Sequence, residues 1–95
     1  MNPIFGNKVK EKASMNVVEK LSDVFDLVLY NDDVNTFDWV IDSLIDVCHH
    51  DELQAEQCAY IVHYKGKCIV KSGDFNALSL MHRELTNRNL SAEVE

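Results

Sequence analysis

The sequence lacks an apolar run of the ~18 residues that a transmembrane helix needs. The N-terminal stretch Met1–Met15 also lacks the apolar centre of a signal peptide. Cysteine is scarce, with three residues that form an odd set without a CxxC pair. Such a set fits free, buried thiols in a reducing compartment better than a disulfide framework. We therefore expect a cytoplasmic protein.

Positive charge is also scarce, because 9 Lys and Arg face 16 Asp and Glu for a net charge of −7. This balance argues against nucleic acid or an anionic membrane as the partner. It is compatible with a cationic ligand or a basic protein surface, and equally with an acidic surface that serves solubility alone. No internal repeat or low-complexity segment is present. With 46% apolar and 26% charged residues, the 95-residue chain reads as one small globular domain.

The first half of the chain divides into an extension, a strand and a helix. Residues 1–24 are rich in Lys and Glu and predict a flexible N-terminal extension, leaving residues 25–95 as the domain. Asp26–Tyr30 alternates and carries strand formers, which predicts a first strand. An apolar stripe at helical period then predicts a helix over Thr36–His49, with Asn35 or Thr36 as its N-cap. The stripe consists of Phe37, Val40, Ile41, Leu44, Ile45 and Cys48.

The second half predicts two more helices and two more strands. Asp51 can cap a helix over Glu52–Tyr64, and Gly66 can end it in a left-handed conformation. The remaining expected elements are a strand Cys68–Lys71, a turn and cap Ser72–Asp74, a helix Phe75–Asn87 with Phe75, Leu78, Met81 and Leu85 inward, and a strand within Leu90–Glu95. This order, β-α-α-β-α-β, predicts an α+β fold with a three-stranded antiparallel sheet and three helices packed on one face.

An acidic turn between the first strand and the first helix is the main candidate site. Asn31, Asp32, Asp33, Asn35 and Thr36 crowd into six positions. Asn and Asp favour turns, and carboxylates stabilise a helix N-terminus, so structure alone can explain part of this cluster. The functional alternative is a cation site in which acceptor oxygens of Asn31 and Asp32 hold a charged amine. A peptide α-amino group, with a pKa of about 7.7–8.0, is such a cation.

Other polar clusters give weaker signals. His63, beside apolar residues near the end of the second helix, is either a structural histidine or a group that shares a ligand with a carboxylate. The run His49–Glu52 reads as a polar connection between helices, since adjacent residues seldom converge on a metal. A hydrolase that uses His63 with Asp32 or Cys58 would need an oxyanion-forming turn that the sequence lacks. We therefore expect no enzyme activity, metal or cofactor.

Three stretches together resemble the ClpS family, the bacterial adaptors that deliver N-degron substrates to a Clp AAA+ protease. They are LVLYNDDVNTFDWVID, AYIVHYKGK and the closing LSAEVE, which together span most of the chain from Asp26 to Glu95. Each piece alone is weak, but their order and spacing form a joint pattern. The resemblance implies an adaptor that binds a free protein N-terminus whose first residue is Leu, Phe, Tyr or Trp.

The resemblance also implies roles for individual residues and partners. Asn31, Asp32 and His63 would hold the α-amino group, and Asp33, Asn35 and Thr36 would line the turn near the peptide backbone. Phe37, Val40, Ala59, Val62 and Leu90 would build the apolar pocket. The implied partners are N-degron substrate proteins and a ClpA- or ClpC-type unfoldase, with the adaptor as a monomer and the N-terminal extension engaging the protease.

One alternative remains open at the level of sequence. The fold also resembles that of the ribosomal stalk protein's C-terminal domain, so the chain could be an acidic docking module without a pocket for an N-terminus. Convergence of Asp32 and His63 in one cleft beside Val40 and Val62 would favour the adaptor, and their placement on opposite faces would favour the docking module.

Overall fold

The computed structural model describes residues 23–95, which form three strands and three helices in the predicted order. The elements are β1 (Phe25–Tyr30), α2 (Phe37–Cys48), α3 (Glu52–Lys65), β2 (Lys67–Gly73), α4 (Phe75–Asn87) and β3 (Ser91–Val94). Nearly all of the predicted extension, residues 1–24, lies outside the described residues. None of the described helices is long and apolar enough to cross a membrane.

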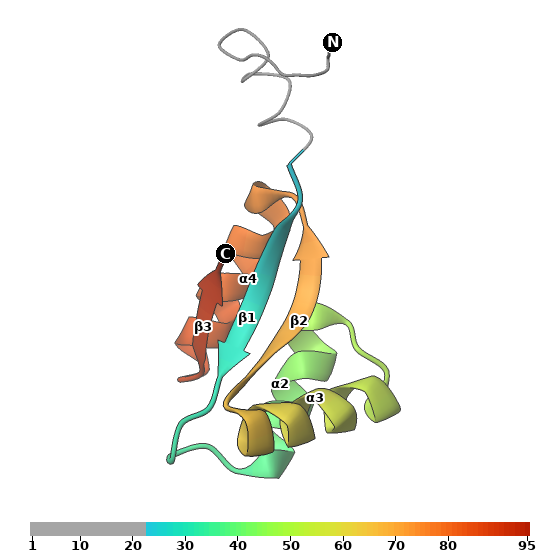
Figure 1. Ribbon diagram of the computed structural model, residues 1–95, viewed down its shortest axis with the longest axis vertical. Coiled ribbons are helices and arrows are strands. Elements are labelled where there is room, and N and C mark those ends of the chain that lie inside the picture. Colours follow the sequence, from blue (N-terminus) through green and yellow to red (C-terminus); the bar gives the residue numbers. More distant parts are fainter. Residues whose placement is uncertain (1–22) are drawn as a thin grey trace, which may run out of the picture.

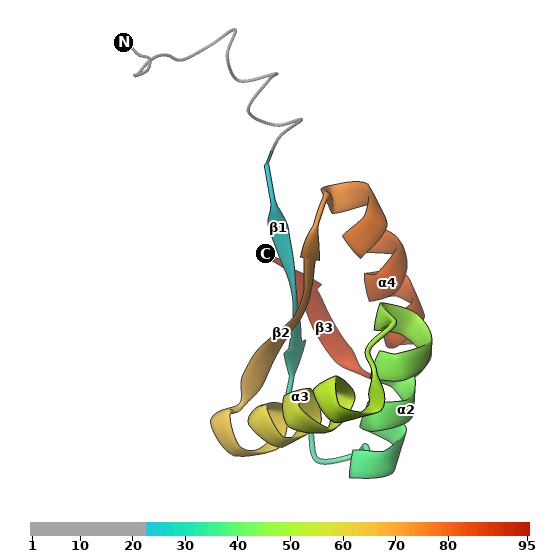
Figure 2. The same ribbon diagram turned by 90° about the vertical axis from the view of Figure 1, so that its right-hand side faces the viewer.

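The sheet has the strand order β2-β1-β3, and both neighbours of β1 run antiparallel to it (Figure 1). Leu29 in the central strand faces Cys68 on one side and Ala92 on the other. The three helices cover one face of the sheet, and Figure 2 shows α2 and α4 along that face with α3 crossing near its lower end. The predicted fold class is therefore confirmed.

Polar side chains define where each helix begins. Thr36, Asp51 and Asp74 are the N-caps, and each accepts a hydrogen bond from the backbone N–H three residues later. Thr36 rather than Asn35 is thus the cap of α2, and this helix is shorter than predicted by one residue at each end. Gly66, with φ of 97°, ends α3 as expected, one residue later than predicted.

The core lies between the sheet and the helices and is built from aliphatic side chains and two thiols. Cys48 and Cys58 are buried as predicted, whereas Cys68 is only half-buried. Burial raises the pKa of Cys48 to about 11 and, together with the nearby Cys68 thiol, that of Cys58 to about 12. Both thiols are therefore protonated at neutral pH and behave as small apolar side chains.

Two local predictions need correction. The second strand, β2, spans Lys67–Gly73 instead of Cys68–Lys71, because it pairs with the full length of β1, from Tyr30 to Phe25. Phe75 does not point inward: it is 52% exposed and packs edge-on against Phe25, with ring centroids 5.4 Å apart.

The polar connection between α2 and α3 contains one exposed and one buried histidine. His49 is exposed and takes a left-handed conformation, with φ of 61°, as the C-cap of α2. His50 instead turns into the core, where it is 4% exposed and donates a hydrogen bond from Nε2 to the Val70 carbonyl oxygen at 2.6 Å. A buried β2 carbonyl thus gains a partner from the inter-helix connection, which ties α2 to the sheet.

Candidate functional site

A pocket of about 260 Å³ lies where the end of β1, the turn after it, the start of α2 and the end of α3 meet. Its lining consists of Leu29, Tyr30, Asn31, Asp32, Asp33, Asn35, Phe37, Val40, Ala59, Val62, His63 and Leu90. These residues come from four separate stretches of the chain. The site therefore exists only once the sheet and helices have packed together.

Asp32 organises the polar side of the pocket. Its Oδ1 accepts hydrogen bonds from the backbone N–H groups of Val34 and Asn35, both at 2.9 Å. Its Oδ2 accepts one from Asn35 Nδ2 at 2.9 Å. A carboxylate has about four lone-pair positions, so one remains at Oδ2. Asp32 is therefore both the residue that closes the turn and an acceptor with spare capacity.

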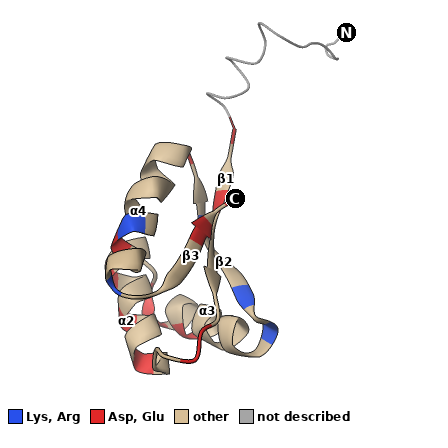
Figure 3. Cartoon of the chain, turned by 90° about the vertical axis from the view of Figure 1, so that its left-hand side faces the viewer, with Lys and Arg blue, Asp and Glu red and all other residues tan. Residues whose placement is uncertain are grey.

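The surroundings of Asp32 favour the ionised form of its carboxyl group. Partial burial alone would raise the pKa of its carboxyl group, but the hydrogen bonds from Asn35 and Val34 outweigh burial and lower it. Asp32 is therefore ionised throughout the physiological range. Figure 3 shows a short acidic stretch, drawn in red, in the turn between β1 and α2.

Asn35 joins this turn to the far wall of the pocket. Besides its bond to Asp32, its Nδ2 donates to the Asn89 carbonyl oxygen at 2.8 Å. Asn89 has a left-handed backbone conformation, with φ of 73°, and directly precedes the pocket residue Leu90. One amide group thus fixes the orientation of the Asp32 carboxylate and the position of the Leu90 segment. The backbone of Asn31 adds a second tie, since its N–H donates to the Gly66 carbonyl oxygen at 2.9 Å.

The apolar side of the pocket comes from the two helices and the entry to β3. Ala59, Val62 and Leu90 are buried, with exposures of 2%, 5% and 5%. Val40 is half-buried and packs against the core, whereas Phe37 at the rim is 42% exposed. The walls are thus apolar and largely formed by packed residues, which suits an apolar side chain.

The structure brings together every predicted site residue except Thr36. Thr36 does not line the pocket, because its hydroxyl group accepts the Trp39 N–H at 3.1 Å and caps α2. Asp32 and His63 line the same pocket as Val40 and Val62, so they do not lie on opposite faces. Asp33 also lines the pocket.

Sequence reasoning missed two lining residues, Leu29 and Tyr30. Both lie at the end of β1, immediately before the acidic turn, and this position was the available signal. The Tyr30 hydroxyl group donates to Glu95, and this hydrogen bond is the largest cause of a raised pKa for Tyr30. Tyr30 therefore stays protonated at neutral pH and links the pocket to the C-terminal residue.

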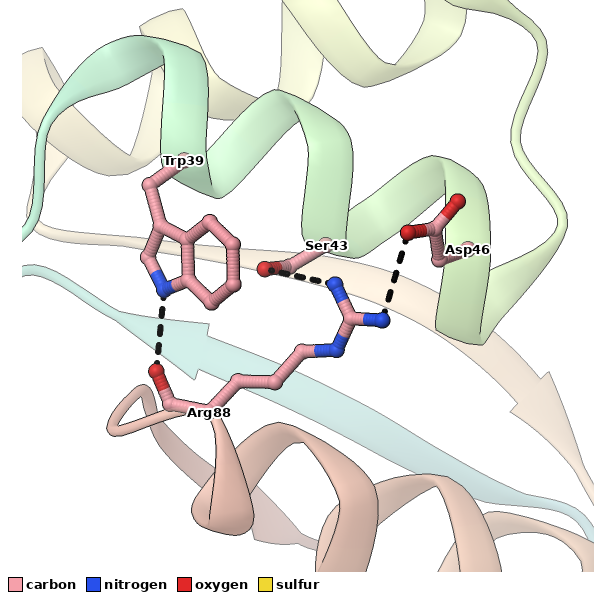
Figure 4. Close-up of polar contacts among 4 residues, drawn as sticks. All are labelled: Trp39, Ser43, Asp46 and Arg88. Carbon is pink, nitrogen blue, oxygen red and sulfur yellow. Dashed lines mark hydrogen bonds and ion pairs between the residues drawn. The ribbon is translucent and has the colours of Figure 1, made fainter.

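A group of polar contacts connects α2 to Arg88 at the end of α4, next to this site (Figure 4). Trp39 Nε1 donates to the Arg88 carbonyl oxygen at 2.9 Å, and the Arg88 guanidinium lies 5.4 Å from the Trp39 ring centroid. Arg88 also donates to Ser43 at 3.5 Å and forms an ion pair with Asp46 at 3.2 Å. These contacts hold the Asn89–Leu90 segment close to the start of α2.

The described residues offer little for catalysis. In residues 23–95 no group of three or more His, Cys, Asp or Glu side chains could hold a metal ion. Cys58 is a poor nucleophile because its thiol is protonated at neutral pH. The fold and the pocket are those of a small α+β binding domain.

Comparison with known proteins identifies the family. The family model described as ATP-dependent Clp protease adaptor protein ClpS matches residues 20–93. The chain therefore belongs to the ClpS family, which is a family of adaptors and not of enzymes. The predicted family is thus confirmed.

One curated protein and one solved structure are similar to this chain. The ATP-dependent Clp protease adapter protein ClpS of Acetivibrio thermocellus is 37% identical over 59 residues, which cover 62% of this chain and 60% of that protein. The match thus spans about 60% of the length of this curated relative. The structure of Agrobacterium tumefaciens ClpS2 bound to L-phenylalaninamide matches with a TM-score of 0.73 at 19% identity, covering 76% of this chain and 94% of that one. At this identity the second match shows the shared fold.

Proposed function

We propose that this chain binds proteins through a free α-amino group and a bulky apolar first residue, and delivers them to a Clp AAA+ unfoldase of the ClpA or ClpC type. The observation that carries the proposal is the pocket itself, in which the acceptor oxygens of the Asp32 turn lie beside an apolar wall. This convergence favours the adaptor over a docking module that lacks a pocket. The family membership supports the Clp unfoldase as partner.

The polar side of the pocket matches the chemistry of a chain end. An α-ammonium group has three N–H donors, and Asn31, Asp32 and His63 offer an amide oxygen, a carboxylate and an imidazole as acceptors. The remaining lone-pair position at Asp32 Oδ2 is available for one of these donors. Because Asp32 is ionised, this hydrogen bond is charge-assisted and worth more than a neutral one.

The apolar side provides selection for the first residue. Full burial of a Leu or Phe side chain is worth about 1.5–3 kcal/mol, which separates these residues from Ala by roughly one to two decades in Kd. The solved relative from A. tumefaciens carries L-phenylalaninamide, a ligand that combines a free α-amino group with a phenyl ring. The same combination of a charged amine and an apolar group would meet the acidic and the apolar side of this pocket, which supports the proposal.

Fluorescence anisotropy with labelled peptides tests the proposal. We expect a Leu- or Phe-initiated peptide to bind the wild-type chain at least tenfold more tightly than its N-acetylated form or an Ala-initiated peptide. Asp32→Ala should weaken binding strongly, whereas Asp38→Ala, which changes an exposed carboxylate outside the pocket, is the matched charge control. Equal binding of the free and acetylated peptides would refute the proposal.

A further inference from the structure

Helix α3 carries apolar side chains on two opposite faces, although packing against the core requires only one. Its inner face consists of the buried residues Ala55, Cys58, Ala59 and Val62. Its outer face carries Tyr60 and Tyr64, which are 58% and 66% exposed. The two tyrosine rings stack on each other, with centroids 4.9 Å apart. The fold of the domain does not account for this exposed pair.

The tyrosine pair is continuous with the pocket. The Phe37 ring lies 5.7 Å from the Tyr60 ring and 5.3 Å from the His63 ring, and the His63 ring lies 4.7 Å from the Tyr64 ring. Phe37 and His63 also line the pocket, whereas Tyr60 and Tyr64 do not. We call the four residues Phe37, Tyr60, His63 and Tyr64 the aromatic ledge. It extends the site outward from the pocket rim along α3.

We propose that the aromatic ledge binds the side chain of the third residue of the protein N-terminus whose first residue fills the pocket. This inference rests on the proposed function and adds a second specificity site to it. In an extended peptide, alternate side chains point to the same side and recur every ~6.6–7 Å. The first and third side chains therefore face the same surface, and the second points away.

The part of the ledge outside the pocket begins close to the pocket rim. Tyr60 is the nearest ledge ring that lies outside the pocket, and its centroid is 5.7 Å from that of the rim residue Phe37. One alternate step of an extended chain, ~6.6–7 Å, is longer than this rim-to-Tyr60 distance, so a third residue that passes Phe37 can contact the Tyr60–Tyr64 pair. The second residue makes no contact with the ledge in this register.

The chemistry of the ledge selects an aromatic third residue. Tyrosines provide large, rigid contact areas at a low cost in conformational entropy, and they pair well with another ring. The faces of aromatic rings are electronegative, and the neighbouring turn carries Asp32 and Asp33, so an acidic third residue should be disfavoured. We expect Phe in the third position to bind about two- to tenfold more tightly than Ala.

A double-mutant cycle by fluorescence anisotropy tests this register. The peptides begin Leu-Ala-Ala, Leu-Ala-Phe and Leu-Phe-Ala and are otherwise identical. The proteins are wild type, Tyr60→Ala, Tyr64→Ala and, as a control, Leu53→Ala, which removes an exposed apolar side chain at the other end of α3. In each protein the gain in affinity is the ratio of the Leu-Ala-Ala Kd to the Leu-Ala-Phe Kd. We expect this gain to disappear in both tyrosine variants and to persist in Leu53→Ala.

Two results would overturn the proposal. One is that Leu-Ala-Phe binds the wild-type chain no more tightly than Leu-Ala-Ala does. The other is that Leu-Phe-Ala binds more tightly than Leu-Ala-Ala and loses this advantage in the tyrosine variants. Failure of the ledge is distinguishable from failure of the proposed function. If only the ledge idea is wrong, Leu-Ala-Ala still binds in a manner that N-acetylation abolishes. If the proposed function is wrong, none of the three peptides binds better than its acetylated form.

Discussion

Removal of the Asn35 side chain should weaken the domain and its site together. Asn35→Ala deletes two hydrogen bonds, one to the Asp32 carboxylate at 2.9 Å and one to the Asn89 carbonyl oxygen at 2.8 Å. The first bond orients the proposed anchor, and the second attaches the turn to the chain before Leu90. No other side chain among residues 23–95 forms hydrogen bonds to both segments.

The size of the effect follows from the two bonds. A neutral hydrogen bond contributes about 0.5–1.5 kcal/mol and one to a charged group about 1.5–3 kcal/mol, and partial exposure of Asn35 favours the lower end of each range. We therefore expect a loss of about 2 kcal/mol in the free energy of unfolding. For a domain of this size the loss corresponds to a fall in Tm of about 8–16 °C. Asn35→Asp should lower the free energy of unfolding further, because it also places a second carboxylate beside Asp32.

Urea denaturation followed by circular dichroism gives the measurement. Asn87→Ala is the control, because Asn87 is exposed at the end of α4 and lies outside the pocket. It should change stability by no more than about 0.5 kcal/mol. If Asn35→Ala matched this control, or if Asn35→Asp were as stable as wild type at pH 7, the bridging role of Asn35 would be refuted.

Three further predictions concern other parts of the fold. Arg88→Ala should reduce the free energy of unfolding by about 1–2 kcal/mol, since it removes a guanidinium that lies over the Trp39 ring and forms hydrogen bonds. Arg88→Lys should restore only part of the lost stability, as measured by thermal melts. Gly66→Ala should cost about 1–2 kcal/mol, because a φ of 97° strains any side chain although the added Cβ meets no atom within 4 Å. The lowered pKa of Asp32 stabilises the fold above the unfolded pKa of about 3.9, and this contribution is lost as the pH falls through the folded pKa. Urea titrations from pH 5 downward should therefore show a shallower decline for Asp32→Asn than for wild type.

Local signals in the sequence account for most of the fold. The apolar stripe of α2 and the caps Asp51, Asp74 and Gly66 identify helices because the periodicity and the capping chemistry act within a few residues. Where the sequence left Asn35 and Thr36 as alternative caps, the structure decides for Thr36. Asn35 is occupied by contacts to Asp32 and to a segment more than fifty residues away, which no local pattern could indicate.

Long-range pairing explains what the sequence did not predict. The length of β2 depends on its pairing with β1, so Ser72 and Gly73 extend the strand where their local character predicts a turn. Phe75 follows the apolar period of α4, yet as the first residue of this helix it stays 52% exposed and packs edge-on against Phe25 of β1. Tyr30 lines the pocket together with residues of α3, and its position just before the acidic turn was the only local sign of this.

The polar and apolar sides of the pocket are connected by a single network, and this has a consequence for specificity. Asn35 holds the Asp32 carboxylate and the segment before Leu90 with one amide group, so it ties the acceptor to the apolar wall. A lysine side chain also presents an ammonium group, but it carries no second side chain on the adjacent carbon. Only a chain terminus combines an ammonium group with an apolar branch one carbon away. If the proposed function is correct, internal lysines should therefore compete poorly even at high concentration, because they can satisfy the acceptors but leave the apolar wall exposed.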